Sequence, residues 1–216
     1  MEEKEIHDEL SAIRGLMERS SKFISLSGLS GILAGVYALI GATIVYYEVY
    51  SKMPVPLNPY VQSTPDVEGA SYGYISNFPL GILLVPIIIL LASITTGILL
   101  SKRKARKNGQ SIWGRTSRAL MFHMAIPLLT GGAVIAISFY YDSIVFIVPA
   151  MLIFYGLSLV SASNFTFTDV KYLGLLEIAL GLIAACLPGY GLLFWAIGFG
   201  LLHIIYGSMM YLKYDR

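Results

Sequence analysis

Six apolar runs dominate this sequence, and each is long enough to cross a membrane as a helix. They cover residues 24–47, 79–100, 119–140, 144–162, 171–187 and 190–211. A bilayer hydrocarbon core about 30 Å thick needs about 20 apolar residues in a helix. Hydrophobic residues make up 56% of the chain and charged residues only 13%, which excludes a water-soluble globular domain. We therefore predict an all-α polytopic membrane protein with six transmembrane helices.

Charge balance and cysteine content exclude two further classes. Lys and Arg total 15 and Asp and Glu total 13, so the chain lacks the excess charge of a basic nucleic-acid-binding protein. Cys186 is the only cysteine, which excludes a secreted domain held together by disulfides. We expect membrane lipids as partners and no nucleic acid.

The distribution of positive residues predicts how the chain is oriented. Cytoplasmic loops of membrane proteins collect Lys and Arg. An even number of spans with both termini in the cytoplasm leaves only Lys52 on the outside. The densest run follows the second apolar segment and comprises Lys102, Arg103, Lys104, Arg106 and Lys107. We interpret it as a topogenic, lipid-facing cluster of a bacterial inner-membrane protein, with a specific anionic-lipid site as the alternative.

Three segments lie outside the apolar runs. Residues 1–23 carry apolar residues at a helical spacing (Ile6, Leu10, Ile13 and Met17), which predicts a cytoplasmic amphipathic helix. That helix either lies on the membrane or continues into the first span, or it associates with a second copy or a protein partner. Residues 51–77 form a long outside loop whose tyrosines we interpret as interfacial anchors, and residues 212–216 form a cytoplasmic tail.

The second half of the chain contains an internal repeat. A shift of 51 residues places the third and fourth apolar runs over the fifth and sixth, and it aligns Tyr155-Gly156 with Tyr206-Gly207. Each copy is an apolar helix, a short outside turn and a second helix that ends in Ile-x-Tyr-Gly. The repeat predicts a membrane helical hairpin, and the first two runs are candidates for a third, diverged copy.

The last hairpin resembles a known family. Residues 175–191 (LLEIALGLIAACLPGYG) and 198–207 (GFGLLHIIYG) are similar to the repeat of small six-span bacterial membrane proteins of the HdeD type. The resemblance covers about the last 45 residues and is weaker over 130–163. It implies a six-helix fold and an association with acid resistance and envelope stress, with no established molecular activity.

Small residues mark the helix faces that we expect to contact other helices. Close approach of two helices in lipid depends on glycine, alanine and serine at the contact. Ridges of such residues include Ser27, Gly31 and Gly35 in the first run, with further glycines at Gly156, Gly200 and Gly207. We predict packing inside the bundle, with a homo-oligomer through the same faces as the alternative.

Three ionisable residues lie inside the predicted spans, namely His123, Glu177 and His203. A charge at bilayer depth costs at least about 2.5 kcal/mol, so each group is expected to have a compensating partner or a function. All three are expected in the cytoplasmic half and on small-residue stripes that face other helices. Tyr155 and Ser158 add hydroxyl groups at a similar depth.

These side chains leave three functions open. They can carry protons or a solute, they can bind a metal ion as in a metal-dependent hydrolase, or they can join helices through a Glu177–His203 hydrogen bond. The sequence holds no HExxH motif, nucleophile elbow or phosphate-binding loop, so no catalytic residue and no cofactor are assigned. We predict a non-enzymatic membrane protein, with a proton-linked transporter or channel and an intramembrane hydrolase as the alternatives.

Overall fold

Helices make up most of the chain that the structure describes, with short turns between them. The computed structural model describes residues 27–52, 80–107, 113–141 and 143–215. The predicted amphipathic helix at 1–23 and nearly all of the predicted outside loop lie outside these residues. No strand occurs in the described part of the chain. The all-α prediction is therefore confirmed for these residues.

The helices follow the predicted apolar runs closely. In chain order they are α2 (Gly28–Lys52), α4 (Leu80–Lys107), α5 (Arg115–Tyr140), a 3₁₀ turn η1 (Ile144–Phe146), α6 (Ile147–Ala162) and α7 (Asp169–Cys186). The last apolar segment combines α8 (Gly191–Trp195), the π-helical η2 (Ala196–Leu202), α9 (His203–Met210) and the π-helical η3 (Tyr211–Asp215). Gly189, in the turn before α8, has a φ of 97°, a conformation that favours glycine.

Five helical segments in the described residues are long and apolar enough to span a membrane. They are Gly28–Glu48, Leu84–Lys107, Arg115–Tyr140, Ile144–Ala162 and Gly191–Asp215. The six-span count is not confirmed by these criteria, since α7 is missing from the set. The reason is its charge: Asp169, Lys171 and Glu177 all lie within its 18 residues.

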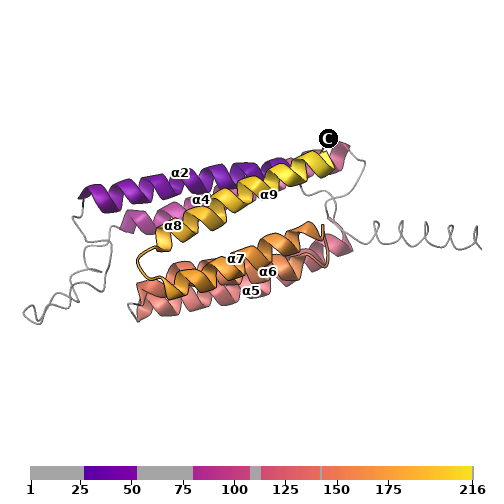
Figure 1. Ribbon diagram of the computed structural model, residues 1–216. Helices are drawn as coiled ribbons and strands as arrows, with labels where there is room; N and C mark the ends of the chain where they lie inside the picture. Colours follow the sequence, from indigo (N-terminus) through magenta and orange to yellow (C-terminus); the bar gives the residue numbers. More distant parts are fainter. Residues whose placement is uncertain (1–26, 53–79, 108–112, 142, 216) are drawn as a thin grey trace, which may run out of the picture.

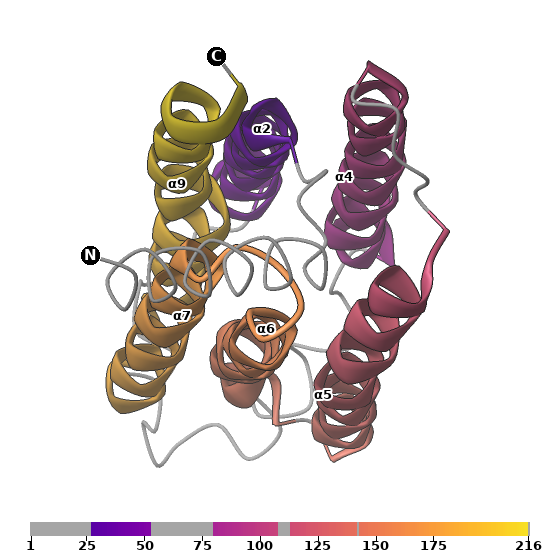
Figure 2. The same ribbon diagram turned by 90° about the vertical axis from the view of Figure 1, so that its right-hand side faces the viewer.

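The helices form two layers of three (Figure 1). In the upper layer α2 lies between α4 and the α8–α9 segment, and in the lower layer α6 lies between α5 and α7. Figure 2, seen along the bundle, shows the same two rows with α8–α9 above α7 and α4 above α5. The layers meet mainly where α6 and α7 contact α8 and η2.

The last predicted hairpin opens between the layers. Helix α7 contacts α8 and η2 near the turn, but its main neighbour is α6, whereas the main neighbour of α9 is α2. The two halves of this hairpin therefore belong to different layers (Figure 2). Their divergence leaves space for side chains between α7, α6 and η2, and two of the three predicted ionisable residues lie there.

Glycine determines the helix pairing in the lower layer. A Cβ added to Gly156 of α6 would lie 2.5 Å from the Gly174 carbonyl oxygen of α7, and one added to Gly174 would lie 2.7 Å from the Gly156 oxygen. The two backbones are thus in contact, an approach that only glycine allows at this site.

The upper layer uses the same kind of contact. A Cβ on Gly35 of α2 would lie 2.6 Å from the Gly200 carbonyl oxygen, and a Cβ on Gly207 would lie 2.8 Å from the Gly28 oxygen. Gly31 faces Gly207 as well, since a Cβ added there would lie 3.1 Å from the Gly207 Cα. One helix pair in each layer, α6–α7 below and α2 with the α8–α9 segment above, is therefore in direct backbone contact.

The tail of the chain ties the layers together at one end of the bundle, which we call the basic end because α4 finishes there with Lys104, Arg106 and Lys107. Asp215 accepts hydrogen bonds from the Ser27 hydroxyl (3.0 Å) and the Gly28 amide (2.8 Å) at the start of α2, and it pairs with Lys104.

The residues just before Asp215 contact the lower layer instead. Lys213 Nζ and the Tyr214 hydroxyl both donate to Asp169 of α7, at 2.8 and 2.9 Å. Because Asp215 contacts α2 and α4 while Lys213 and Tyr214 contact α7, three consecutive residues of the tail link the two layers.

Candidate functional site

Glu177 is the most deeply buried ionisable group in the described chain. It lies in the middle of α7, between the layers, and its exposed fraction is 0%. Among the described residues neither carboxyl oxygen has a hydrogen-bond partner. An ionised carboxylate without partners in such an environment is strongly disfavoured, so the site favours either the neutral acid or a cation bound beside it.

His203, the first residue of α9, faces Glu177 from the other layer. Its Nδ1 lies 3.0 Å from the Gly198 carbonyl oxygen, and its Nε2 lies 2.7 Å from the Tyr155 hydroxyl. A carbonyl oxygen can only accept, so Nδ1 carries a hydrogen and donates it to Gly198. In the neutral imidazole Nε2 then accepts from Tyr155, and we assign this tautomer from the hydrogen-bond pattern.

The predicted Glu177–His203 hydrogen bond is not formed. The distance between His203 Nδ1 and Glu177 Oε1 is 3.5 Å, too long for a strong bond, although it is short enough for an ion pair if the ring is protonated. The Nδ1 hydrogen is directed at the Gly198 carbonyl, which lies in the π-helical η2 five residues before His203. π-Helical turns of this kind are often found at functional sites.

Gly198 also makes room for the carboxyl group. A Cβ at this position would lie 2.6 Å from Glu177 Oε2 and 2.5 Å from a methyl carbon of Leu152. Any larger residue would therefore displace Glu177 or the helix η2 that leads into His203. One glycine thus supplies both the acceptor for the imidazole and the space for the acid.

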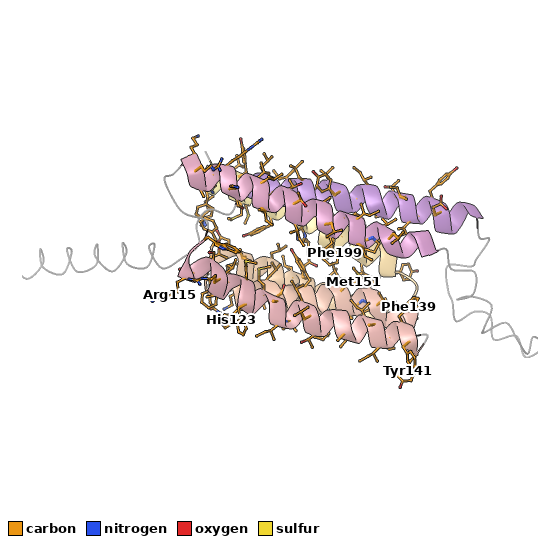
Figure 3. All side chains as sticks on the ribbon, turned by 180° about the vertical axis from the view of Figure 1, so that it is seen from behind. Arg115, His123, Phe139, Tyr141, Met151 and Phe199 are labelled. Carbon is orange, nitrogen blue, oxygen red and sulfur yellow. The ribbon has the colours of Figure 1, made fainter. Side chains whose placement is uncertain are left out.

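Aromatic rings cover the other side of His203. The Phe199 ring lies 5.1 Å from Tyr155, 6.0 Å from His203 and 5.7 Å from Trp195, centroid to centroid. Figure 3 shows Phe199 and Met151 between the two layers. Leu152, which is fully buried, forms a core cluster with Ala184 and Phe194 beside the acid. The polar groups are therefore enclosed by apolar side chains.

His123 does not join this site. It lies on α5, near the end of the helix that carries Arg115 (Figure 3), and it is exposed on the surface of the chain. Its ring stacks on Phe165 at 4.7 Å and meets Phe122 edge-on at 5.8 Å. The expectation that His123 faces other helices is wrong, because α5 packs on α6 through a different face that includes Gly131.

The other predicted site residues are placed as follows. Tyr155 contacts His203 directly, whereas the buried Ser158 hydroxyl donates to the Tyr155 carbonyl oxygen at 2.7 Å within α6. No three His, Cys, Asp or Glu side chains in the described residues lie close enough together to hold a metal ion. Within the described residues the arrangement is therefore a pair of ionisable groups with a tyrosine.

Sequence reasoning missed three residues of this region, Gly198, Phe199 and Tyr206. Gly198 contacts both ionisable groups, and Phe199 covers the imidazole. The hydroxyl oxygen of Tyr206 is buried and has no hydrogen-bond partner among the described residues. Only Tyr206 left a signal in the sequence, since it is the repeat equivalent of Tyr155; the role of Gly198 depends on a π-helical turn that an α-helical spacing does not predict.

The fold and the site together define a helical protein with several segments long and apolar enough to span a membrane and a buried acid–imidazole–tyrosine set between two layers. Comparisons with protein-family models, with curated proteins and with solved structures found no match to this chain. Its function is therefore inferred from the site.

Proposed function

We propose that this protein moves protons across a membrane, with Glu177 as the group that takes them up and releases them. The observation that carries the proposal is the full burial of a carboxyl group whose two oxygens have no hydrogen-bond partner among the described residues. A carboxyl that only joined helices would be expected to make hydrogen bonds. Intramembrane acids without such a role commonly mark ion or proton paths.

The neighbouring imidazole supports this proposal. The imidazole of His203 is a group that can bind and release a proton, and its Nδ1 lies 3.5 Å from Glu177 Oε1. A proton that leaves Glu177 while His203 is protonated leaves an ion pair, which costs less than an isolated carboxylate. Tyr155 can reverse its hydrogen bond, accepting from Nε2 of the imidazolium where it donates to the neutral ring.

For the membrane arrangement we propose six spans, in which α7 joins the five segments named above, in a bacterial inner membrane with both termini cytoplasmic. The support for α7 is its position in the lower layer, in backbone contact with α6. The support for the orientation is the Lys and Arg distribution, which favours a cytoplasmic basic end. The resemblance to HdeD-type proteins supports a link to acid or envelope stress.

A direct test measures proton entry into liposomes that contain the purified protein and an enclosed pH-sensitive dye. An imposed acid outside pH, with valinomycin and potassium to balance charge, should acidify wild-type liposomes faster than protein-free ones. We expect Glu177→Gln to reduce the rate to the protein-free level. The matched control is Glu48→Gln, which removes an acid near the C-terminal end of α2, away from the basic end, and should leave the rate unchanged.

Two results would overturn the proposal. One is a wild-type rate equal to that of protein-free liposomes. The other is an undiminished rate in Glu177→Gln with protein of the same reconstituted amount. A structural membrane protein without transport is then the remaining candidate, supported by the glycine contacts that build both layers.

A further inference from the structure

The buried polar groups around Glu177 extend toward one end of the bundle only. Tyr206 lies on α9, about one turn from His203 in the direction of the basic end. Its hydroxyl oxygen is buried and has no hydrogen-bond partner in the described part of the chain. Buried polar groups are nearly always hydrogen-bonded, so a buried hydroxyl without a partner calls for an explanation.

The surroundings of Tyr206 connect the surface of the bundle with its centre. Tyr155 and Tyr206 pack against one core cluster, formed by Leu159, Val170 and Leu173. Val170 follows Asp169 at the start of α7, at the basic end. Tyr155 in turn bonds to His203, which lies beside Glu177. Tyr206 therefore lies between the Asp169 group and the site.

Asp169 supplies an anionic group at the surface end of this series. It is the first residue of α7, and its side chain is 20% exposed. Hydrogen bonds from Lys213 and from Tyr214 lower the pKa of this carboxyl below its usual value, against the opposing effect of burial. Asp169 is thus charged at neutral pH, as one half of an ion pair with Lys213.

From Glu177 toward the other end of the bundle, away from the basic end, the described residues provide no such series of buried polar side chains. The side chains there are those of Leu152, Ala184 and Phe194, which form one core cluster, and the buried Trp195 next to them. Among the described residues this part of the interior is apolar. A proton that reaches Glu177 in this conformation therefore has polar groups on one side only.

We infer that Tyr206 is the relay between the basic end of the bundle and Glu177, in a proton route that runs from Asp169 past Tyr206 to Tyr155, His203 and Glu177. The inference rests on the proposed function. The Tyr206 oxygen accepts one proton from the side of Asp169 and releases its own hydroxyl proton toward Tyr155, so the residue ends unchanged. Water molecules bridge the distances between these side chains. Tyr206 is a positioning and relay residue, and Glu177 is the acceptor.

The test removes only the Tyr206 hydroxyl, by Tyr206→Phe, and follows hydrogen–deuterium exchange at the Glu177 carboxyl. The full-length protein is moved into D₂O and the carboxylic C=O band is recorded by infrared spectroscopy, with Glu177→Gln used to identify the band. We expect exchange to slow by about tenfold or more in Tyr206→Phe, and proton entry into liposomes to slow by a similar factor. The control Tyr172→Phe alters an exposed tyrosine of α7 and should change neither rate.

The outcomes separate this inference from the function on which it rests. If Glu177→Gln abolishes proton entry while Tyr206→Phe matches wild type in both measurements, the relay is refuted and the function stands. If Glu177→Gln leaves proton entry unchanged, the function fails, and an effect of Tyr206→Phe on carboxyl exchange would still establish the route. A thermal melt of Tyr206→Phe within about 1 °C of wild type excludes misfolding as the cause.

Discussion

Helix contacts within a layer differ in kind from contacts between the layers. Within the lower layer Gly156 and Gly174 bring two backbones together with no side chain between them. Between the layers the contact is made by the side chains of Glu177, His203 and Phe199. A backbone contact allows one separation only, whereas side chains can change rotamers and hydrogen-bond partners. We therefore expect each layer to behave as a rigid unit. The side chains that change rotamer or hydrogen-bond partner are expected at the boundary between the layers.

The largest effect is expected where the backbone contact is blocked. Gly156→Ile places the Cβ of a branched side chain 2.5 Å from the Gly174 carbonyl oxygen, which belongs to a helix and cannot move alone. We predict a loss of about 3 kcal/mol or more in the free energy of unfolding, because no rotamer relieves the overlap. Unfolding by dodecyl sulfate in mixed micelles measures this loss.

The control for this variant is Gly132→Ala on α5, where an added Cβ meets no atom within 4 Å. Its stability should stay within about 0.5 kcal/mol of wild type. A similar loss in both variants would show that glycine matters through helix flexibility and not through the contact, and would remove the basis of the comparison.

The tail contact is expected to have the next largest effect. Asp215→Ala removes the carboxylate that accepts from Ser27 and Gly28 at the start of α2, and caps of this kind contribute about 1 kcal/mol. Asp215→Asn keeps an acceptor oxygen and should lose only part of that. Equal melting temperatures for wild type and Asp215→Ala would show that the tail does not stabilise α2.

The acid at the boundary between the layers should matter less for stability than either of these contacts. Glu177→Gln removes no hydrogen bond that the described residues make, so we predict a change below about 1 kcal/mol in the free energy of unfolding. The same micelle titration measures it. A loss as large as that of Gly156→Ile would assign Glu177 to holding the helices together and weaken the transport proposal.

The smallest effect concerns the contact between the tail and α7. Hydrogen bonding from Lys213 lowers the pKa of Asp169 in the folded protein, so the contact stabilises the fold above the usual carboxyl pKa of 3.8. The contribution is lost as pH falls below that value toward the lowered pKa. Melting temperatures of wild type and Asp169→Asn should therefore differ slightly near neutral pH and converge as the pH falls through the lowered pKa of Asp169. A difference that grows on acidification would contradict this assignment.

Much of the fold was predictable because hydrophobic length constrains a membrane helix. The expected runs at 144–162 and 171–187 correspond to helical segments at 144–162 and Asp169–Cys186. The partner of each helix was not predictable in the same way. The repeat predicted that α7 and α9 pair with each other. Glycines occur on several helix faces, however, and Gly174 packs α7 against α6 while Gly207 packs α9 against α2.

The site was predictable in its residue types and not in its geometry. Glu177, His203 and Tyr155 were singled out because ionisable and hydroxyl groups are rare at bilayer depth, and the structure brings these three together. His123 met the same criteria and lies on the surface of the chain, since a stripe of small residues does not tell which neighbour covers it. The bond from His203 to Gly198 depends on a π-helical turn that has no signature in the hydrophobic pattern.

The contact of Asp215 with the start of α2 has a consequence for the order in which the protein can be completed. Asp215 follows Gly28 by 187 residues, so at about 5–20 residues per second it is synthesised about 10–40 s later. For that time the first turn of α2 lacks the carboxylate that later caps it. The contact between the start of α2 and the end of the chain therefore forms last. A ribosome stalled before residue 213 would hold a bundle in which α2 and the tail are not yet joined at the basic end.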